Sequence, residues 1–127
     1  MSVIQVDVQV LHFEHNVWMN ELEFFEGELH FFENRLSDLV MRYREIEVLA
    51  KLEQFQNQFI RQKEVLDKLK RDIRVHEQQL GLKLQKEQDL QEHFVNDHAS
   101  MRARMTSYRK IYNELKTDFF HYLAKWH

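Results

Sequence analysis

Apolar residues recur every seven positions between Val8 and Tyr43, and this repeat constrains the fold more than any other feature of the chain. One row of the repeat is Val8, His15, Leu22, Leu29, Leu36 and Tyr43, and the other is Leu11, Trp18, Phe25, Phe32 and Leu39. Two rows with this spacing form one apolar stripe along a long helix, as in coiled coils. The repeat therefore predicts a helix over about residues 7–44, with His15 in its buried row.

A second repeat begins after Arg44, out of step with the first by about two residues, which predicts a tight turn at about residues 44–47. Its rows are Leu52, Phe59, Leu66, Ile73 and Leu80, and Val48, Phe55, Gln62, Leu69 and His76. Gly81 follows directly and suits a left-handed helix cap. The second helix is therefore expected over about residues 47–80.

A third repeat predicts a helix over about residues 83–125. Its rows are Leu84, Gln91, His98, Met105, Tyr112, Phe119 and Trp126, and Glu87, Phe94, Met101, Tyr108, Leu115 and Tyr122. With no proline and only two glycines, the chain has few turn-forming residues, so the connections should be short. The 127 residues thus predict one all-α domain, an elongated antiparallel three-helix bundle of up-and-down topology.

Composition argues against several classes of function. The 18 Lys and Arg residues are interleaved with 21 Asp and Glu residues, so no basic stripe is present to bind nucleic acid. No apolar run approaches the ~20 residues of a membrane span, and the N-terminus lacks the basic and apolar regions of a signal peptide. The absence of cysteine excludes disulfides and thiolate metal sites. A cytoplasmic location is expected by elimination.

The first helix carries a second apolar row on its opposite side. This row contains Val6, Phe13, Val17, Phe24 and Phe31, about half a turn from the Leu22 and Leu29 row. Two neighbouring helices cannot cover both sides of one helix, so either the bundle encloses this helix in another way or the second side contacts another copy of the chain. A homodimer through Phe13, Val17, Phe24 and Phe31 is expected.

Histidine and carboxylate side chains in the buried rows indicate a metal site. With turns near residues 45 and 81, antiparallel pairing brings His15, His76 and Glu87 to one height, with His12 and Glu77 beside them. Two imidazoles and a carboxylate suit Zn, Mn or Fe and leave positions for water or O₂. The alternative is a buried polar layer that only fixes the register of the helices.

A second group is expected further along the bundle. Glu26 and His30 lie four residues apart on the first helix, and the same antiparallel count places them level with Asp97 and His98. A site rich in carboxylates favours paired iron or manganese. Alternatively, these side chains are solvated or paired with lysine and arginine at the edges of the packed faces.

A helical bundle with inward-facing histidine and carboxylate ligands resembles the ferritin-like and haemerythrin-like metalloproteins in architecture. Such a resemblance implies a bundle that binds metal for O₂, peroxide or iron chemistry. The Glu-x-x-His motif of ferritin-like proteins is replaced here by Glu26-x-x-x-His30 and His93-x-x-x-Asp97, so no residue role is transferred.

The sequence therefore predicts a small helical bundle that binds one or two transition-metal ions (Zn, Fe or Mn), for redox chemistry, sensing or storage. The competing hypothesis is a scaffold protein whose long helices bind partners without a metal. An enzyme with a metal in the bundle core is a special case of the first hypothesis. No phosphate-binding loop or nucleophile motif points to another chemistry.

Overall fold

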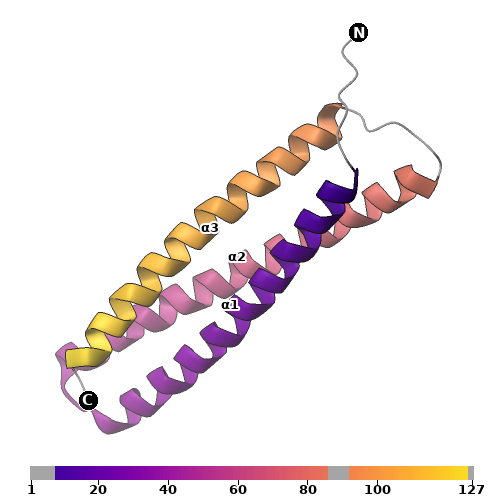
Figure 1. Ribbon diagram of the computed structural model, residues 1–127. Coiled ribbons are helices and arrows are strands. Elements are labelled where there is room, and N and C mark those ends of the chain that lie inside the picture. Colours follow the sequence, from indigo (N-terminus) through magenta and orange to yellow (C-terminus); the bar gives the residue numbers. More distant parts are fainter. Residues whose placement is uncertain (1–7, 86–91, 126–127) are drawn as a thin grey trace.

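Within the described part of the chain there are three long helices, α1 (Val8–Arg42), α2 (Ile46–Gln85) and α3 (Glu92–Lys125). The computed structural model describes residues 8–85 and 92–125, and this part of the chain contains no strand. Figure 1 shows an elongated bundle in which α2 runs antiparallel to α1 and α3 returns in the direction of α1. The predicted all-α three-helix bundle is thereby confirmed.

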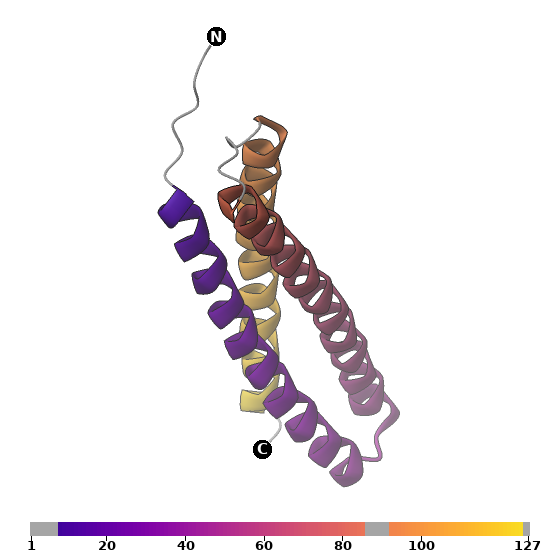
Figure 2. The ribbon, with the colours of Figure 1, turned by 90° about the vertical axis from the view of Figure 1, so that its right-hand side faces the viewer.

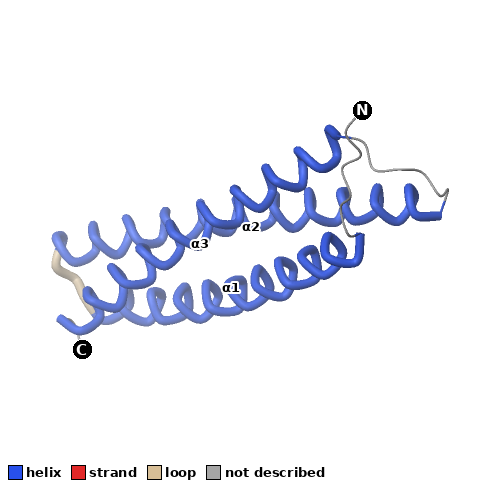
Figure 3. The backbone as a smooth tube through the Cα atoms, turned by 45° about the horizontal axis from the view of Figure 1, so that its top comes forward, coloured by secondary structure: helices blue, strands red, loops and turns tan. Residues whose placement is uncertain are grey.

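A three-residue connection, 43–45, joins α1 to α2 at one end of the bundle (Figure 3). The backbone N–H of Tyr43 still donates to the carbonyl of Leu39 at 3.1 Å, which completes the last turn of α1. The first turn of α2 is closed by a bond of 3.0 Å from the N–H of Leu49 to the carbonyl of Glu45. The turn predicted at residues 44–47 is therefore correct to within about two residues.

The end of α2 corrects a prediction. We expected Gly81 to cap the helix and Lys83 to begin the next one, but α2 continues through both residues to Gln85. Gly81 does not adopt a left-handed backbone conformation, and it is exposed within the helix. A single exposed glycine weakens a helix by only about 1 kcal/mol, which is too little by itself to end α2. Beyond it, Nζ of Lys83 still lies 5.9 Å from the centroid of the Phe94 ring.

The buried rows along α1 and α2 form the core as predicted, and α3 contributes its aromatic and methionine row. Most of the core is one continuous apolar cluster from Trp18 and Ile73 to the opposite end of the bundle. A smaller cluster of Leu11, Leu80 and Phe94 lies at the end where α2 finishes and α3 begins. Buried polar side chains separate the two clusters.

Ion pairs fix the axial position of α3 relative to α1. The pairs recur every seven residues on both helices, as expected for neighbours that run parallel and pack along one seam. They are Glu14 with Arg102 at 2.6 Å, Glu21 with Arg109 at 2.7 Å, and Glu28 with Lys116 at 2.8 Å. In Figure 2, viewed at 90° to Figure 1, α3 lies alongside both other helices, and Arg104 of α3 also pairs with Asp72 of α2 at 2.9 Å.

No helix in the part of the chain that the structure describes combines the length and apolar character needed to cross a bilayer.

Candidate metal centre

Each of the three helices places one histidine in the same layer of the core. His15 of α1, His76 of α2 and His98 of α3 are 1%, 3% and 1% exposed. Their ring centroids are 5.1 Å apart for His15 and His76, 4.9 Å for His15 and His98, and 5.4 Å for His76 and His98. One ring nitrogen from each residue lies within 4.8 Å of the other two. Three imidazoles thus converge on one point inside the bundle.

Each ring also carries a buried nitrogen that has no hydrogen-bond partner in the structure. These atoms are Nε2 of His15, Nε2 of His76 and Nδ1 of His98. A buried polar atom without a partner destabilises a protein by about 1–3 kcal/mol, and native proteins contain few of them. Three such atoms in one layer are therefore evidence for a group that binds them together.

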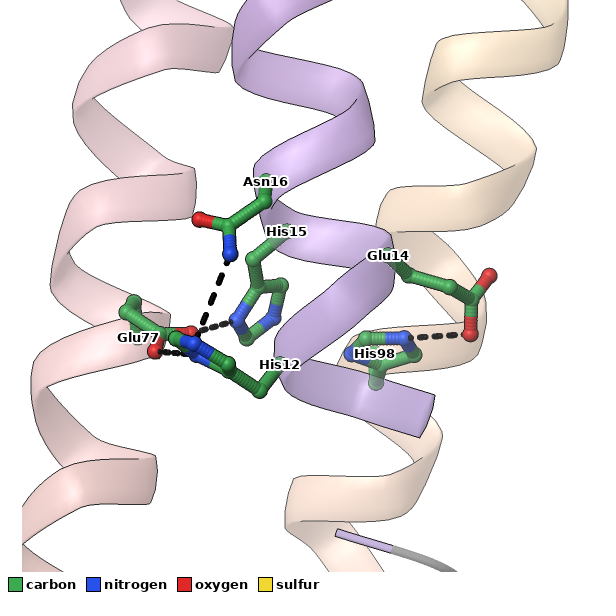
Figure 4. A network of polar contacts seen from close by, with 6 residues as sticks. All are labelled: His12, Glu14, His15, Asn16, Glu77 and His98. Carbon is green, nitrogen blue, oxygen red and sulfur yellow. Dashed lines mark hydrogen bonds and ion pairs between the residues drawn. The ribbon is translucent and has the colours of Figure 1, made fainter. Parts of the chain in front are cut away.

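Carboxylates engage the remaining nitrogens of two of these rings (Figure 4). Glu77 of α2 accepts hydrogen bonds from Nδ1 of His15 and, through its other oxygen, from Nδ1 of His12. On the other side, Nε2 of His98 lies 3.1 Å from Oε1 of Glu14. A carboxylate that accepts from the outer N–H fixes the orientation of the ring and leaves the inner nitrogen with a free lone pair. This arrangement is common among histidines that ligate metals.

Glu14 is itself held by Arg102. The guanidinium donates to both carboxylate oxygens, at 2.9 and 2.6 Å. These bonds, together with that from His98, hold the pKa of Glu14 below its ordinary value, although partial burial opposes the shift. The carboxylate is therefore ionised at neutral pH and can orient His98.

Aromatic rings pack against the three imidazoles. Phe94 stacks on His76 at 4.0 Å between ring centroids and 9° between planes, and Trp18 lies 4.9 Å from His98. The small cluster of Leu11, Leu80 and Phe94 lies one turn to one side of the histidine layer, and the main core lies on the other. The layer is thus enclosed by apolar side chains at both ends.

This enclosure keeps the imidazoles of His76 and His98 neutral. Burial lowers the pKa of His76 from 6.5 to about 4, with a further contribution from repulsion by His15 and His98. Burial also lowers the pKa of His98, against the opposing effect of Glu14. A neutral imidazole offers the lone pair that a metal ion needs, so protons compete little with a metal at pH 7.

Three imidazole nitrogens suit Zn²⁺ and similar transition metals better than Mg²⁺ or Ca²⁺, which prefer oxygen. Tetrahedral Zn²⁺ with bonds of ~2.0–2.1 Å holds its nitrogens about 3.3 Å apart, which is closer than the 4.8 Å limit found here. Binding of Zn²⁺ would therefore require the three ring nitrogens to approach one another more closely than in this structure. The three residues would leave a fourth position open for water or a small ligand.

The structure brings together His15 and His76, as expected, with His12 and Glu77 beside them. Glu87, the predicted third member, lies outside the described residues. His98 occupies the third position instead. His12 is half exposed and bonds to Glu77 and, at 3.4 Å, to Asn16, so it lies beside the layer and not in it.

The second predicted group does not form. Glu26 pairs with Lys63 and Lys70 of α2, each at 3.3 Å, while His30 and Asp97 are exposed. Phe25, the neighbour of Glu26, packs on Tyr112, which lies fourteen residues, or about 21 Å of helix, from His98. The alternative reading of Glu26, an edge residue paired with lysine, is confirmed.

The position at which α2 ends explains why His98 joins His15 and His76 and why the second predicted group does not form. Ending it at Gly81 would pair residue 75 with about residue 88, whereas the structure places His76 against His98, a shift of about ten residues. Sequence reasoning also missed Glu14. Its signal was available in the matching seven-residue spacing of Glu14, Glu21 and Glu28 on α1 and the basic residues of α3.

Comparison of the chain with protein-family models, curated proteins and solved structures finds no match in any of the three.

Proposed function

We propose that this protein binds a transition-metal ion, with Zn²⁺ the best match, through His15, His76 and His98. The observation that carries the proposal is the convergence of three buried imidazoles that each have an unpartnered nitrogen. Glu77 and Glu14 support it, because carboxylates on the outer nitrogens are typical of histidines that ligate metals. One ligand from each helix would let the ion join all three helices.

The proposal is tested on protein purified without a histidine tag. We expect about one Zn²⁺ per chain by elemental analysis and a melting temperature that rises with added Zn²⁺ and falls with a chelator. Replacing His15, His76 or His98 singly by leucine should abolish the bound metal and the thermal shift. His30→Leu is the matched control, since His30 is an exposed histidine of α1, and it should retain both.

A buried polar layer without metal gives a different result. The leucine variants would then match or exceed the wild type in melting temperature, because apolar side chains often replace buried polar groups without loss. Fewer than ~0.2 metal ions per chain, together with a melting temperature indifferent to the chelator, would refute the metal site. Circular dichroism shows whether each variant keeps its helices.

We also propose self-association through α1, the partner surface expected from the sequence. Phe13, Phe24 and Phe31 are 65%, 61% and 68% exposed, and Val17 continues their row. Val10, Val17, Phe24 and Phe31 recur every seven residues over three heptads, which is the pattern of helices that pair with a like helix. A second copy offers a row of the same length and spacing. The cytoplasmic location stays a prediction.

A further inference from the structure

A groove of about 530 Å³ lies between α2 and α3, away from the histidine layer. Buried Leu69 and Tyr108 contribute to its lining, and Val65 and Ile111 contribute further apolar surface. On α3, Ala103 and Ser107 are one turn apart, and their small side chains leave the space open. Sites for small molecules in proteins commonly have volumes of about 300–1,000 Å³, so this groove has the size of a ligand site.

A buried side-chain amide oxygen in the groove lacks a hydrogen-bond partner. Gln62 lines it, is only 8% exposed, and its side-chain oxygen Oε1 makes no hydrogen bond. The nearby hydroxyl of Tyr108 donates at 3.4 Å to the backbone carbonyl of Gln62 and not to Oε1. Gln62 thus occupies a position in the buried row of α2 where a leucine or phenylalanine would continue the apolar pattern. A hydrogen-bond donor of a ligand, such as a hydroxyl, would satisfy this oxygen.

The charge of the groove is positive. Arg61 and Arg104 line it, and no carboxylate does so among the described residues. Arg61 pairs with Glu64 at 3.4 Å, but both side chains are largely exposed, so this pair is weak. Arg104 is anchored by Asp72 at 2.9 Å, which fixes its position beside the groove. A guanidinium with unused N–H donors binds a carboxylate or sulfonate well.

We infer that this groove binds an amphipathic organic anion, a medium-chain carboxylate. Its apolar chain lies on Val65, Leu69 and Ile111, and its carboxylate meets Arg61. A hydroxyl next to the carboxylate, as in a 3-hydroxy acid, would add a hydrogen bond to Oε1 of Gln62. From Arg61 to Leu69 the helix rises about 12 Å, which matches a chain of roughly ten carbons. This site is independent of the proposed metal centre.

Decanoate is the probe, measured by its displacement of the fluorescent sulfonate 1-anilinonaphthalene-8-sulfonate. We expect saturable displacement at concentrations below about 1 mM. Ser107→Trp fills the groove from an exposed position and should weaken decanoate binding by at least about tenfold. The double variant Arg61→Gln, Arg104→Gln should weaken decanoate by about tenfold while leaving uncharged decanol unchanged.

The control is Phe24→Ser, which removes a ring from the exposed row of α1, the other apolar surface available to these probes. It should leave decanoate binding unchanged. Binding that survives Ser107→Trp but disappears in Phe24→Ser would overturn the inference, as would the absence of displacement by decanoate. Unchanged helicity and melting temperature in Ser107→Trp would show that the loss of binding is local.

Discussion

The burial of His76 bears on both the stability of the protein in acid and the proposed metal site. Its ring is buried against Phe94, and two other imidazoles lie beside it, so the metal-free core disfavours a positive charge there. The same burial leaves the ring neutral with a free nitrogen lone pair. A metal cation would bind this lone pair, although burial and the two neighbouring imidazoles disfavour a proton there.

The metal-free protein should therefore lose stability in acid. The pKa of His76 is about 4 in the folded chain and near 6.5 when unfolded, so the unfolded chain binds the proton more tightly. The contribution of neutral His76 to the free energy of unfolding is fully present above pH ~6.5. It is lost as the pH falls towards ~4, and the loss amounts to about 3 kcal/mol in all. The lowered pKa of His98 acts in the same direction.

Urea unfolding with chelator at several pH values between 7 and 4 measures this loss. In His76→Phe, which keeps an aromatic ring next to Phe94, the decline of unfolding free energy with pH should be clearly shallower. His30→Phe, at an exposed site, should decline like the wild type. An identical decline in His76→Phe and wild type would show that His76 does not cause the acid sensitivity.

Among the elements, the length of α2 matters most, because it decides which part of α3 faces the histidines. Gly81 lies inside this helix, and a β-carbon added there would meet nothing within 4 Å. Had Gly81 been a left-handed cap, α3 would have begun earlier and His98 would lie further along the bundle. The continuity of α2 thus positions the third imidazole.

Gly81→Ala tests this continuity. Alanine is the better helix former and has room, so we expect the free energy of unfolding to rise by about 0.5–1 kcal/mol. At a left-handed cap the same change would destabilise the protein by a comparable amount. The measurement is urea unfolding, and its sign distinguishes the two conformations of Gly81.

At the scale of the whole molecule, Phe13, Phe24 and Phe31 of α1 form an exposed apolar row. If two copies pair through them, the protein should run as a dimer of about twice 15.7 kDa by size-exclusion chromatography with light scattering at ~50 µM. Phe24→Glu should convert the dimer to a monomer, because a charge in the centre of an apolar interface is poorly solvated.

Ile60→Glu provides the comparison for that experiment, since Ile60 is an exposed apolar residue of α2, away from the α1 row. It should remain dimeric. A wild-type chain that is monomeric at ~50 µM would contradict self-association and leave the α1 row without a second copy to cover it.

The sequence by itself determined the helices, their up-and-down order and the burial of His15, His76 and His98, because an apolar period near seven residues identifies the inner face of a helix. It also placed His15 against His76, since the short turn at 43–45 sets the register between α1 and α2. Only the tertiary structure decided that His98 faces them from α3. A periodic pattern fits nearly as well after a shift along the helix axis. The axial position of α3 therefore depends on where α2 ends and on the ion pairs between α1 and α3, which are Glu14–Arg102, Glu21–Arg109 and Glu28–Lys116.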